Sequence, residues 1–279
     1  MKKLLAIALI LTLALSFAAC GSKTEETQQT GDTAAKQTVV KLGVIGENNE
    51  YWQPVVDELA KEGVTLQFVT FSDYSLPNKA LADGEIDLNA FQHYKYFNNE
   101  CATQGYDLVA IGETVIAPLS LYSDYIKDIS EIKDGDKIAI ASDSTNGGRA
   151  IKLLESLGFL EVDPSVGWVP SVSDITKYNV KIELVELEAS NIPAALPDVT
   201  AAFINGAVAI DAGLKPNEDA IYMEKQEEGS ENPYINIIAA RAEDANNELY
   251  LHIVDLFRSD AVAKIINEQY GGALVPVWE

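Results

Sequence analysis

Short apolar segments alternate with amphipathic ones along most of the chain. The apolar segments are rich in β-branched residues and too short for buried helices, so they predict strands. The predicted strands are Val39–Ile45, Val64–Phe71, Ile86–Phe91, Leu108–Val115, Lys137–Ala141, Lys181–Glu188, Ala201–Ile204 and Ile235–Ala240. Helical spacing predicts helices at Tyr51–Lys61, Ser75–Gly84, Ala150–Leu157, Ala242–Phe257 and Asp260–Tyr270. This alternation predicts an α/β fold with a mainly parallel sheet covered by helices on both faces.

The elements form two α/β series, and the second begins near Ile129. The strand Ile235–Ala240 and the two helices after it follow the second series, and they can return to pack with the elements of the first series. We therefore predict two lobes, residues 39–118 with 236–279 and residues 119–235, joined by crossings near Ala117–Tyr122 and Asn232–Asn236. Ligands of open α/β sheets bind beyond the carboxyl ends of the strands, so that edge is where a site is expected.

The first 19 residues follow a different pattern. Lys2 and Lys3 precede an unbroken apolar run that ends at Cys20 and is short for a membrane span, which predicts an export signal. Phe17–Gly21 resembles the lipobox of bacterial lipoproteins, although leucine is more usual than Phe17. Residues 1–19 are thus predicted to be a lipoprotein signal peptide cleaved before a lipidated Cys20, and a plain secretory signal with an incidental Cys20 is the alternative.

Residues 20–38 contain mainly Ser, Thr, Gln, Glu, Gly and Lys. Such a segment has too little apolar surface to offset the entropy lost on ordering. We predict a flexible tether between the lipidated cysteine and a folded body.

Charge and cysteine content exclude several classes of function. The net charge is −23, and loss of the two signal-peptide lysines would make it −25, so nucleic acid and anionic lipid head groups would be repelled. Cys101 is the only cysteine besides Cys20, which excludes an internal disulfide in the body and a cysteine metal cluster. His93 and His252 lie far apart in the sequence, so we expect no metal site and no cofactor.

The segment Asp87–Phe97 concentrates aromatic residues around His93, between a predicted strand and a helix. Aromatic faces beside a few polar groups suit a pocket for a small, partly apolar molecule. The alternative is a hydrophobic core around the strand–helix junction. The rings concerned are Phe91, Tyr94, Tyr96 and Phe97.

The second motif, Ser142–Arg149, leads from a strand into a helix. Candidate N-cap residues are Ser144, Thr145 and Asn146. Gly147 and Gly148 would allow close backbone approach, and a helix N-terminus with Arg149 one turn in suits a carboxylate or phosphate. The alternative is a capped helix with an exposed Arg149. The spacing of a nucleotide P-loop is absent.

Five motifs in order carry a resemblance that covers nearly the whole chain. They are Phe71–Asn78, Gly84–His93, Thr145–Arg149, Val185–Glu188 and Pro233–Asn236. Together they resemble the MetQ/NlpA methionine-binding lipoproteins. The resemblance implies the two-lobed type II periplasmic-binding-protein fold and capture of L- or D-methionine for an ABC importer.

The resemblance also implies roles for individual residues and partners. Tyr74, Phe91, His93 and Tyr96 would line the pocket for the ligand side chain. Arg149, supported by Asn146, would pair with the ligand α-carboxylate, while Asn205 and Asn236 would hydrogen-bond the head group. The implied protein is a monomer without enzymatic activity, anchored by lipid at the extracytoplasmic face of the cell membrane. Its partners would be an ABC permease and ATPase.

Three positions depart from the family pattern. Lys95 stands where proline is frequent, Gly147 where a larger apolar residue is usual, and Val208 where an aromatic is common. The first two are expected to loosen the backbone near the pocket. The third lies close to Asn205 in sequence and keeps another small amino acid or carboxylate as an alternative ligand.

Two other classes of function compete with the binding protein. An enzyme would use His93 as a general base beside Asp87 or Asp73, with Arg149 holding a substrate carboxylate. A surface adhesin would explain the tether and the charge but would leave the aromatic and arginine motifs without a role. Stabilisation by specific amino acids distinguishes a binding protein from both.

Overall fold

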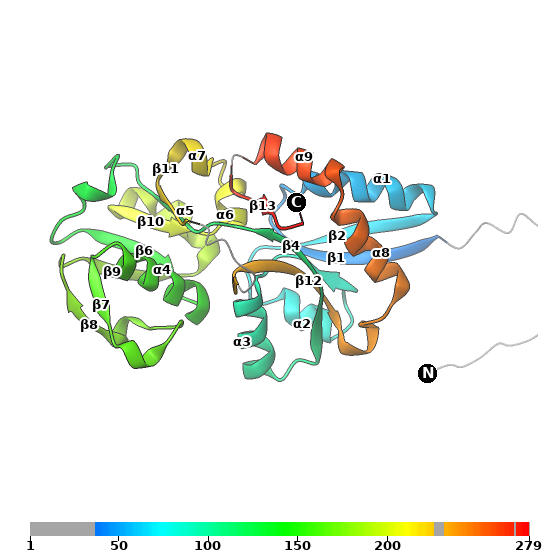
Figure 1. The fold of residues 1–279 in the computed structure, drawn as a ribbon, viewed down its shortest axis with the longest axis horizontal. Coiled ribbons are helices and arrows are strands. Elements are labelled where there is room, and N and C mark those ends of the chain that lie inside the picture. Colours follow the sequence, from blue (N-terminus) through cyan, green and yellow to red (C-terminus); the bar gives the residue numbers. More distant parts are fainter. Residues whose placement is uncertain (1–36, 226–231, 271, 279) are drawn as a thin grey trace, which may run out of the picture. The chain divides into compact units, whose positions relative to one another are not determined.

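The computed structural model describes residues 37–225, 232–270 and 272–278 (Figure 1). The predicted signal peptide, Cys20 and nearly all of the predicted tether lie outside this range. Within it, no helix combines the length and apolar character that crossing a membrane requires.

Lobe I is built on a six-stranded sheet in the order β13-β4-β12-β3-β1-β2. Its strands are β1 (Thr38–Ile45), β2 (Val64–Phe71), β3 (Leu88–Asn89), β4 (Leu108–Ile116), β12 (Ile235–Arg241) and β13 (Val275–Pro276). Strand β1 pairs in parallel with β2 and β3, whereas β12 is antiparallel to β3 and β4. The sheet is therefore mixed, and the predicted mainly parallel arrangement is wrong. The reason is that β4 leaves for the second lobe and β12 returns from it in the opposite direction.

Helices cover both faces of this sheet, as predicted (Figure 1). They are α1 (Gln53–Lys61), α2 (Pro77–Ala82), α3 (Tyr94–Gln104), α8 (Glu248–Phe257) and α9 (Asp260–Gln269). Helices α1, α8 and α9 pack on the face that carries Ile238 and Ala240 of β12. Helices α2 and α3 pack on the face that carries Ile237 and Ala239. Burial on both faces explains why residues 237–240 of β12 form a continuous apolar run rather than an alternating one.

Lobe II has a five-stranded sheet in the order β11-β5-β10-β6-β9 and a separate hairpin of β7 and β8. The strands are β5 (Ser120–Tyr122), β6 (Lys137–Ala141), β7 (Leu160–Val162), β8 (Ile175–Tyr178), β9 (Glu183–Leu187), β10 (Ala201–Ile204) and β11 (Ala220–Met223). Its helices are α4 (Ser144–Ser156), α5 (Ile192–Ala195), α6 (Gly206–Asp211) and α7 (Pro216–Asp219). Helix α4 packs on one face of the sheet, and α5 and α6 pack on the other.

The chain passes from the first sheet to the second between β4 and β5, and returns between β11 and β12. Both passages border the site described below. The predicted residue boundaries of the lobes remain a proposal.

Several predicted elements lie within two residues of their observed bounds, but α4 begins six residues before the predicted Ala150, and α8 begins six residues after the predicted Ala242. Strand β2 has the predicted bounds, but β3 contains two residues where the apolar pattern predicted Ile86–Phe91. The β7–β8 hairpin, β11, β13 and the short helices α5, α6 and α7 were not predicted. Elements this short carry too little periodicity to be recognised and depend on packing against their neighbours.

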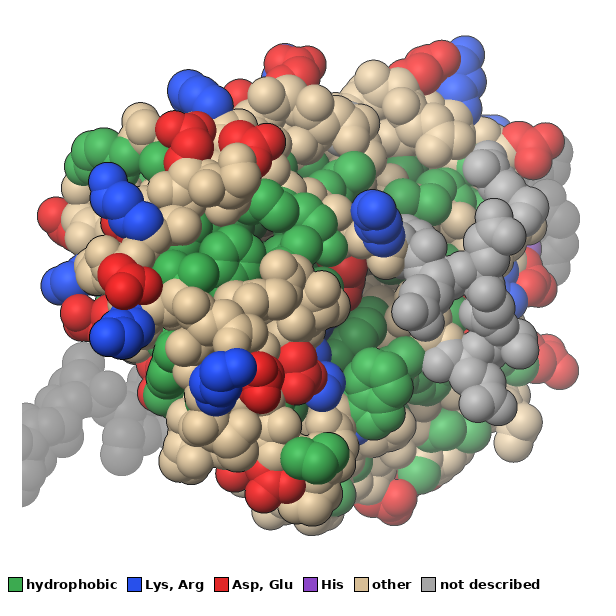
Figure 2. Space-filling model, turned by 60° about the vertical axis from the view of Figure 1, so that its left-hand side comes forward, with side chains coloured by type: hydrophobic (Ala, Val, Ile, Leu, Met, Phe, Trp, Pro, Cys, Tyr) green, Lys and Arg blue, Asp and Glu red, His purple; other side chains and the backbone are tan. Residues whose placement is uncertain are grey.

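Surface charge on the face of lobe II shown in Figure 2 is mixed. Lysine and arginine side chains stand among acidic and apolar ones and form no continuous basic patch on the described part of that face.

Candidate functional site

One cavity is lined by all eight residues that the resemblance assigns to a ligand site. They are Tyr74, Phe91, His93, Tyr96, Asn146, Arg149, Asn205 and Asn236. The first four and Asn236 come from lobe I, whereas Asn146 and Arg149 lie in the first turns of α4 and Asn205 precedes α6. An isolated antiparallel bridge between His93 and Asn236 brings the two lobe I segments together.

An aromatic wall forms the lobe I side of this cavity. The ring centroids of Tyr74, Phe91 and Tyr96 lie 5.9 to 6.1 Å from one another, and Tyr96 and Phe91 meet edge to face. The Tyr96 hydroxyl donates a hydrogen bond to the backbone oxygen of Tyr74 over 2.9 Å. Tyr74 and Tyr96 also belong to a hydrophobic cluster that includes residues of lobe II. These three rings therefore line the cavity and also pack within or against a hydrophobic cluster, while Phe97 lies in a different core cluster.

A buried amide network of Asn78, Asn89 and Gln92 was not anticipated from the sequence. Gln92 donates to the side-chain oxygens of Asn78, over 2.6 Å, and Asn89, over 2.9 Å. Asn78 in turn donates to the Gln92 oxygen over 2.8 Å. Because all three side chains are buried and hydrogen-bonded to one another, the network holds Gln92, which stands between Phe91 and His93, in one conformation.

His93 is neutral, and both of its ring nitrogens are occupied. It caps α3, and its Nδ1 accepts a hydrogen bond from the backbone N–H of Tyr96 over 3.0 Å. The proton is therefore on Nε2, which donates to the Asn146 side-chain oxygen over 3.2 Å. Burial, with the positive charge of Arg149 in second place, lowers the pKa of His93 to about 3. A neutral imidazole without a free nitrogen is poorly suited to act as a general base.

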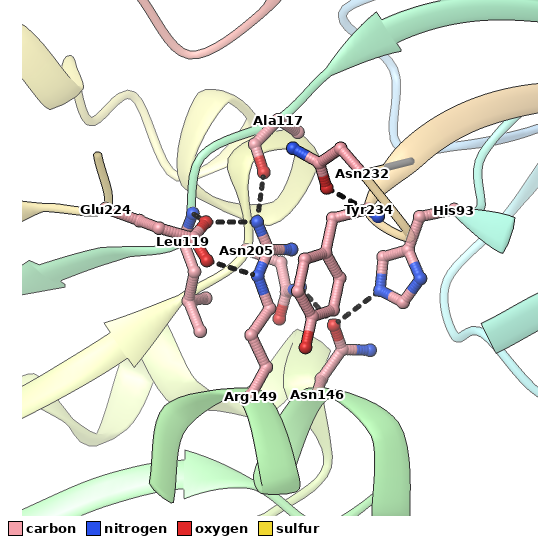
Figure 3. Close-up of polar contacts among 9 residues, drawn as sticks. All are labelled: His93, Ala117, Leu119, Asn146, Arg149, Asn205, Glu224, Asn232 and Tyr234. Carbon is pink, nitrogen blue, oxygen red and sulfur yellow. Dashed lines mark hydrogen bonds and ion pairs between the residues drawn. The ribbon is translucent and has the colours of Figure 1, made fainter. Parts of the chain in front are cut away.

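Asn146 links the two lobes. Its side-chain oxygen accepts hydrogen bonds from His93 and from the Asn205 amide, the latter over 2.8 Å (Figure 3). Its own amide donates to the Asp143 carboxylate over 3.0 Å. Asp143, rather than one of the three predicted residues, is the N-cap of α4 and accepts from the Asn146 backbone N–H. The cap prediction was wrong by one residue, since Asp143 is also a strong N-cap type.

Asn205 retains a hydrogen-bond acceptor that is not used. Its side-chain oxygen is buried and has no hydrogen-bond partner among the described residues. A buried carbonyl oxygen without a donor is costly, so this atom marks a place for a ligand N–H group.

Arg149 is buried, with 2% of its surface exposed, so the exposed-arginine alternative is wrong. Its guanidinium forms a two-point ion pair with Glu224, in which Nε donates to Oε1 over 3.0 Å and Nη2 donates to Oε2 (Figure 3). Nη2 also donates to the Ala117 backbone oxygen over 3.2 Å, and the group lies 4.0 Å from the ring centroid of Tyr234. Nη1 has no hydrogen-bond partner in the described part of the chain.

Glu224 was missed by the sequence analysis. It follows β11 in an acidic region, where a single glutamate carries no recognisable signal. Its position 75 residues from Arg149 in the sequence makes the pairing visible only in the folded chain.

The three departures from the family pattern do not loosen the site. A Cβ atom at Gly147 would lie 2.5 Å from the Ala141 backbone oxygen, so glycine allows α4 to pack closely on β6. The Lys95 backbone N–H donates to the Pro233 oxygen over 2.9 Å, a bond that proline could not make. Val208 packs in the hydrophobic cluster and is not among the residues that line the cavity. The expected loosening was therefore wrong.

The carboxylates that an enzymatic His93 would need are bonded elsewhere. Asp87 accepts from the Lys41 backbone N–H over 2.7 Å, and Asp73 from the Ser75 backbone N–H over 2.8 Å. In the described ranges no three His, Cys, Asp or Glu side chains are grouped to hold a metal ion. The site is instead an aromatic wall facing one buried, paired cation.

Comparisons with known proteins show the family to which this chain belongs. The family model described as NlpA lipoprotein matches residues 40–278. The probable D-methionine-binding lipoprotein MetQ of Vibrio cholerae is 38% identical over 250 residues, which are 89% of this chain and 91% of that relative. A solved nutrient-binding protein from Burkholderia cenocepacia bound to methionine has a TM-score of 0.80 and 34% identity, covering 85% of this chain and 99% of the other. An ABC transporter periplasmic substrate-binding protein from Coxiella burnetii has a TM-score of 0.78 and 35% identity, covering 85% and 100%.

Proposed function

The chain belongs to the NlpA lipoprotein family, and from that premise we propose that it is a lipid-anchored solute-binding protein that captures methionine and passes it to an ABC importer. The single observation that carries the proposal is the cavity in which an aromatic wall from lobe I faces a buried arginine from lobe II. Such a cavity matches a molecule with a soft apolar end and an anionic end.

The methionine side chain would lie against the aromatic wall. A thioether is polarisable and interacts favourably with the edges of aromatic rings. Phe91 and Tyr96 both line the cavity, and the neutral His93 adds no charge that would require compensation.

The amino-acid head group would lie between Arg149, Asn205 and Asn236. The carboxylate would accept from Nη1 of Arg149, the guanidinium nitrogen not already bonded among the described residues. The α-ammonium would donate to the Asn205 side-chain oxygen, which has no partner in the described structure. Asn146, whose side-chain oxygen already accepts two hydrogen bonds, would position His93 and Asn205 rather than contact the ligand itself.

The proposed location follows from the N-terminal sequence together with the family. Residues 1–19 would direct export, Cys20 would carry the lipid at the extracytoplasmic membrane face, and residues 20–38 would tether a monomeric body. A permease and its ATPase would receive the ligand. We propose no enzymatic role, because both nitrogens of His93 are occupied and the carboxylates of Asp87 and Asp73 accept hydrogen bonds from other groups.

A thermal-shift panel of amino acids tests this function on a soluble form that lacks residues 1–20. Methionine at about 100 times its Kd would add roughly 2.7 kcal/mol of stability. For a body of this size that corresponds to a rise in Tm of roughly 5–10 °C. Leucine serves as the matched apolar control. A rise with another amino acid alone would point to the alternative ligand class, and no rise with any amino acid would refute the proposal.

The anchor is tested separately in the full-length chain. Cys20→Ala is expected to release folded protein from the membrane fraction, because Cys20 precedes the described body. Full retention of this variant in the membrane fraction would contradict lipid anchoring through Cys20.

A further inference from the structure

We propose that Glu224 restricts this site to zwitterions and excludes carboxylates that lack an α-ammonium group. The inference rests on the proposed methionine-binding function and adds a residue that determines its specificity. It is carried by the ion pair between Glu224 and Arg149 and by the unused oxygen of Asn205.

The Glu224 carboxylate is held in place from two sides. Besides its two bonds to Arg149, Oε2 accepts the Leu119 backbone N–H over 3.0 Å, and the Glu224 backbone N–H donates to the Leu119 oxygen over 3.0 Å. The side chains of Arg149 and Glu224 are 3% and 11% exposed, so water cannot replace either partner at low cost. Glu224 is therefore expected to stay with Arg149 when a ligand enters.

The pairing changes what Arg149 can offer to a ligand. The edge of the guanidinium formed by Nε and Nη2 is used by Glu224, and Nη2 is used a second time by Ala117. A ligand carboxylate can still accept from Nη1, but it does not meet an uncompensated positive charge. Among the described residues that line the cavity, Arg149 is the only one with a permanent charge, since His93 is neutral.

The net charge of the ligand then decides whether it is accepted. A zwitterion adds no net charge to the buried pair, and its ammonium supplies the donor that the Asn205 oxygen lacks. A carboxylate without an amino group brings a second negative charge into a site that already holds Glu224 and leaves that oxygen unpaired. Both consequences are unfavourable in a buried site, where charges and polar groups are weakly screened.

The test compares L-methionine with 4-(methylthio)butanoate, the same molecule without its amino group, by titration calorimetry. The wild type is expected to bind the second compound at least about 100-fold more weakly, because a site built to hydrogen-bond a polar ligand group rejects an analogue without that group by at least this factor. In Glu224→Gln the ratio of the Kd for 4-(methylthio)butanoate to the Kd for L-methionine should fall about tenfold, because the negative charge that opposes the ligand carboxylate is gone. Glu224→Asp keeps the charge and should keep the wild-type ratio.

Glu155→Gln is the matched control, since Glu155 pairs with Lys152 on the same helix and does not line the cavity. It should leave both affinities unchanged. If the wild type binds methionine but the ratio in Glu224→Gln equals that of the wild type, the inference is refuted and the proposed function stands. If the wild type binds neither compound, the proposed function is refuted together with the inference. If Glu224→Gln does not fold, Glu224→Asp is used instead. A tenfold fall of the Kd ratio in Glu224→Asp, which keeps the negative charge, would overturn the inference.

Discussion

Removing Arg149 alone should lower the unfolding free energy of the unliganded protein more than removing both Arg149 and Glu224. In Arg149→Met the Glu224 carboxylate, 11% exposed in its side chain, would lose both bonds to the guanidinium and keep one bond, to the Leu119 N–H. Breaking a buried pair by deleting one partner costs about 3–5 kcal/mol, because the remaining charge is not compensated. The Ala117 oxygen also loses its bond to Nη2, which adds about 1 kcal/mol.

The double variant Arg149→Met with Glu224→Leu removes the remaining charge. Replacement of a buried ion pair by apolar side chains of similar volume is often neutral or stabilising. We therefore expect the double variant to lose about 2 kcal/mol, for the Ala117 oxygen and the Leu119 N–H that lose their partners, and so to be about 3 kcal/mol more stable than the single variant.

The assay is urea unfolding followed by circular dichroism. Each protein is first freed of bound ligand by unfolding and refolding, because a ligand that binds only the folded state would raise its apparent stability. The difference between single and double variants is a coupling between two residues in contact. A single variant within about 1 kcal/mol of the wild type, or a double variant no more stable than the single one, would refute this account of the pair.

Three further predictions concern other parts of the site. The pKa of His93 is lowered to about 3 in the folded state from about 6.5 in the unfolded chain. Neutral His93 therefore adds fully to the free energy of unfolding above pH 6.5, and this stability is lost as the pH falls, because the unfolded chain then binds a proton that the folded chain does not. Between pH 6 and pH 5 the unfolding free energy of the wild type should thus fall about 1.2 kcal/mol more than that of His93→Gln, measured by urea unfolding. Tyr96→Phe loses the bond to the Tyr74 oxygen and should cost about 1 kcal/mol of stability in the same assay, with no loss expected if that bond is absent. Asp211 accepts bonds from the backbone N–H groups of Glu47 and Asn48 in the other lobe, so Asp211→Ala should weaken methionine binding roughly threefold to tenfold in calorimetry, and unchanged affinity would count against this interlobe contact.

The sequence by itself determined most of the local structure. Strand β2 was predicted to the residue because its apolar run is bounded by a glycine turn before it and polar residues after it. The eight cavity-lining residues that the family resemblance implies were also named from the sequence, and six of them stand within the five motifs whose order along the chain resembles one family. The two-lobed α/β fold followed from the same resemblance and from the alternation of elements, and the structural relatives confirm it.

The tertiary structure decided the pairings between residues far apart in the sequence. Nothing within either segment predicts that Glu224 binds Arg149, 75 residues away, or that His93 reaches Asn146, 53 residues away. The direction of β4 and β12 was likewise hidden, because an apolar run has the same pattern whether its neighbours are parallel or antiparallel. Local patterns record which side of an element is buried, whereas the choice of partner depends on how the lobes dock. For that reason the charge balance of the site, and with it the proposed preference for zwitterions, could be inferred only from the folded chain.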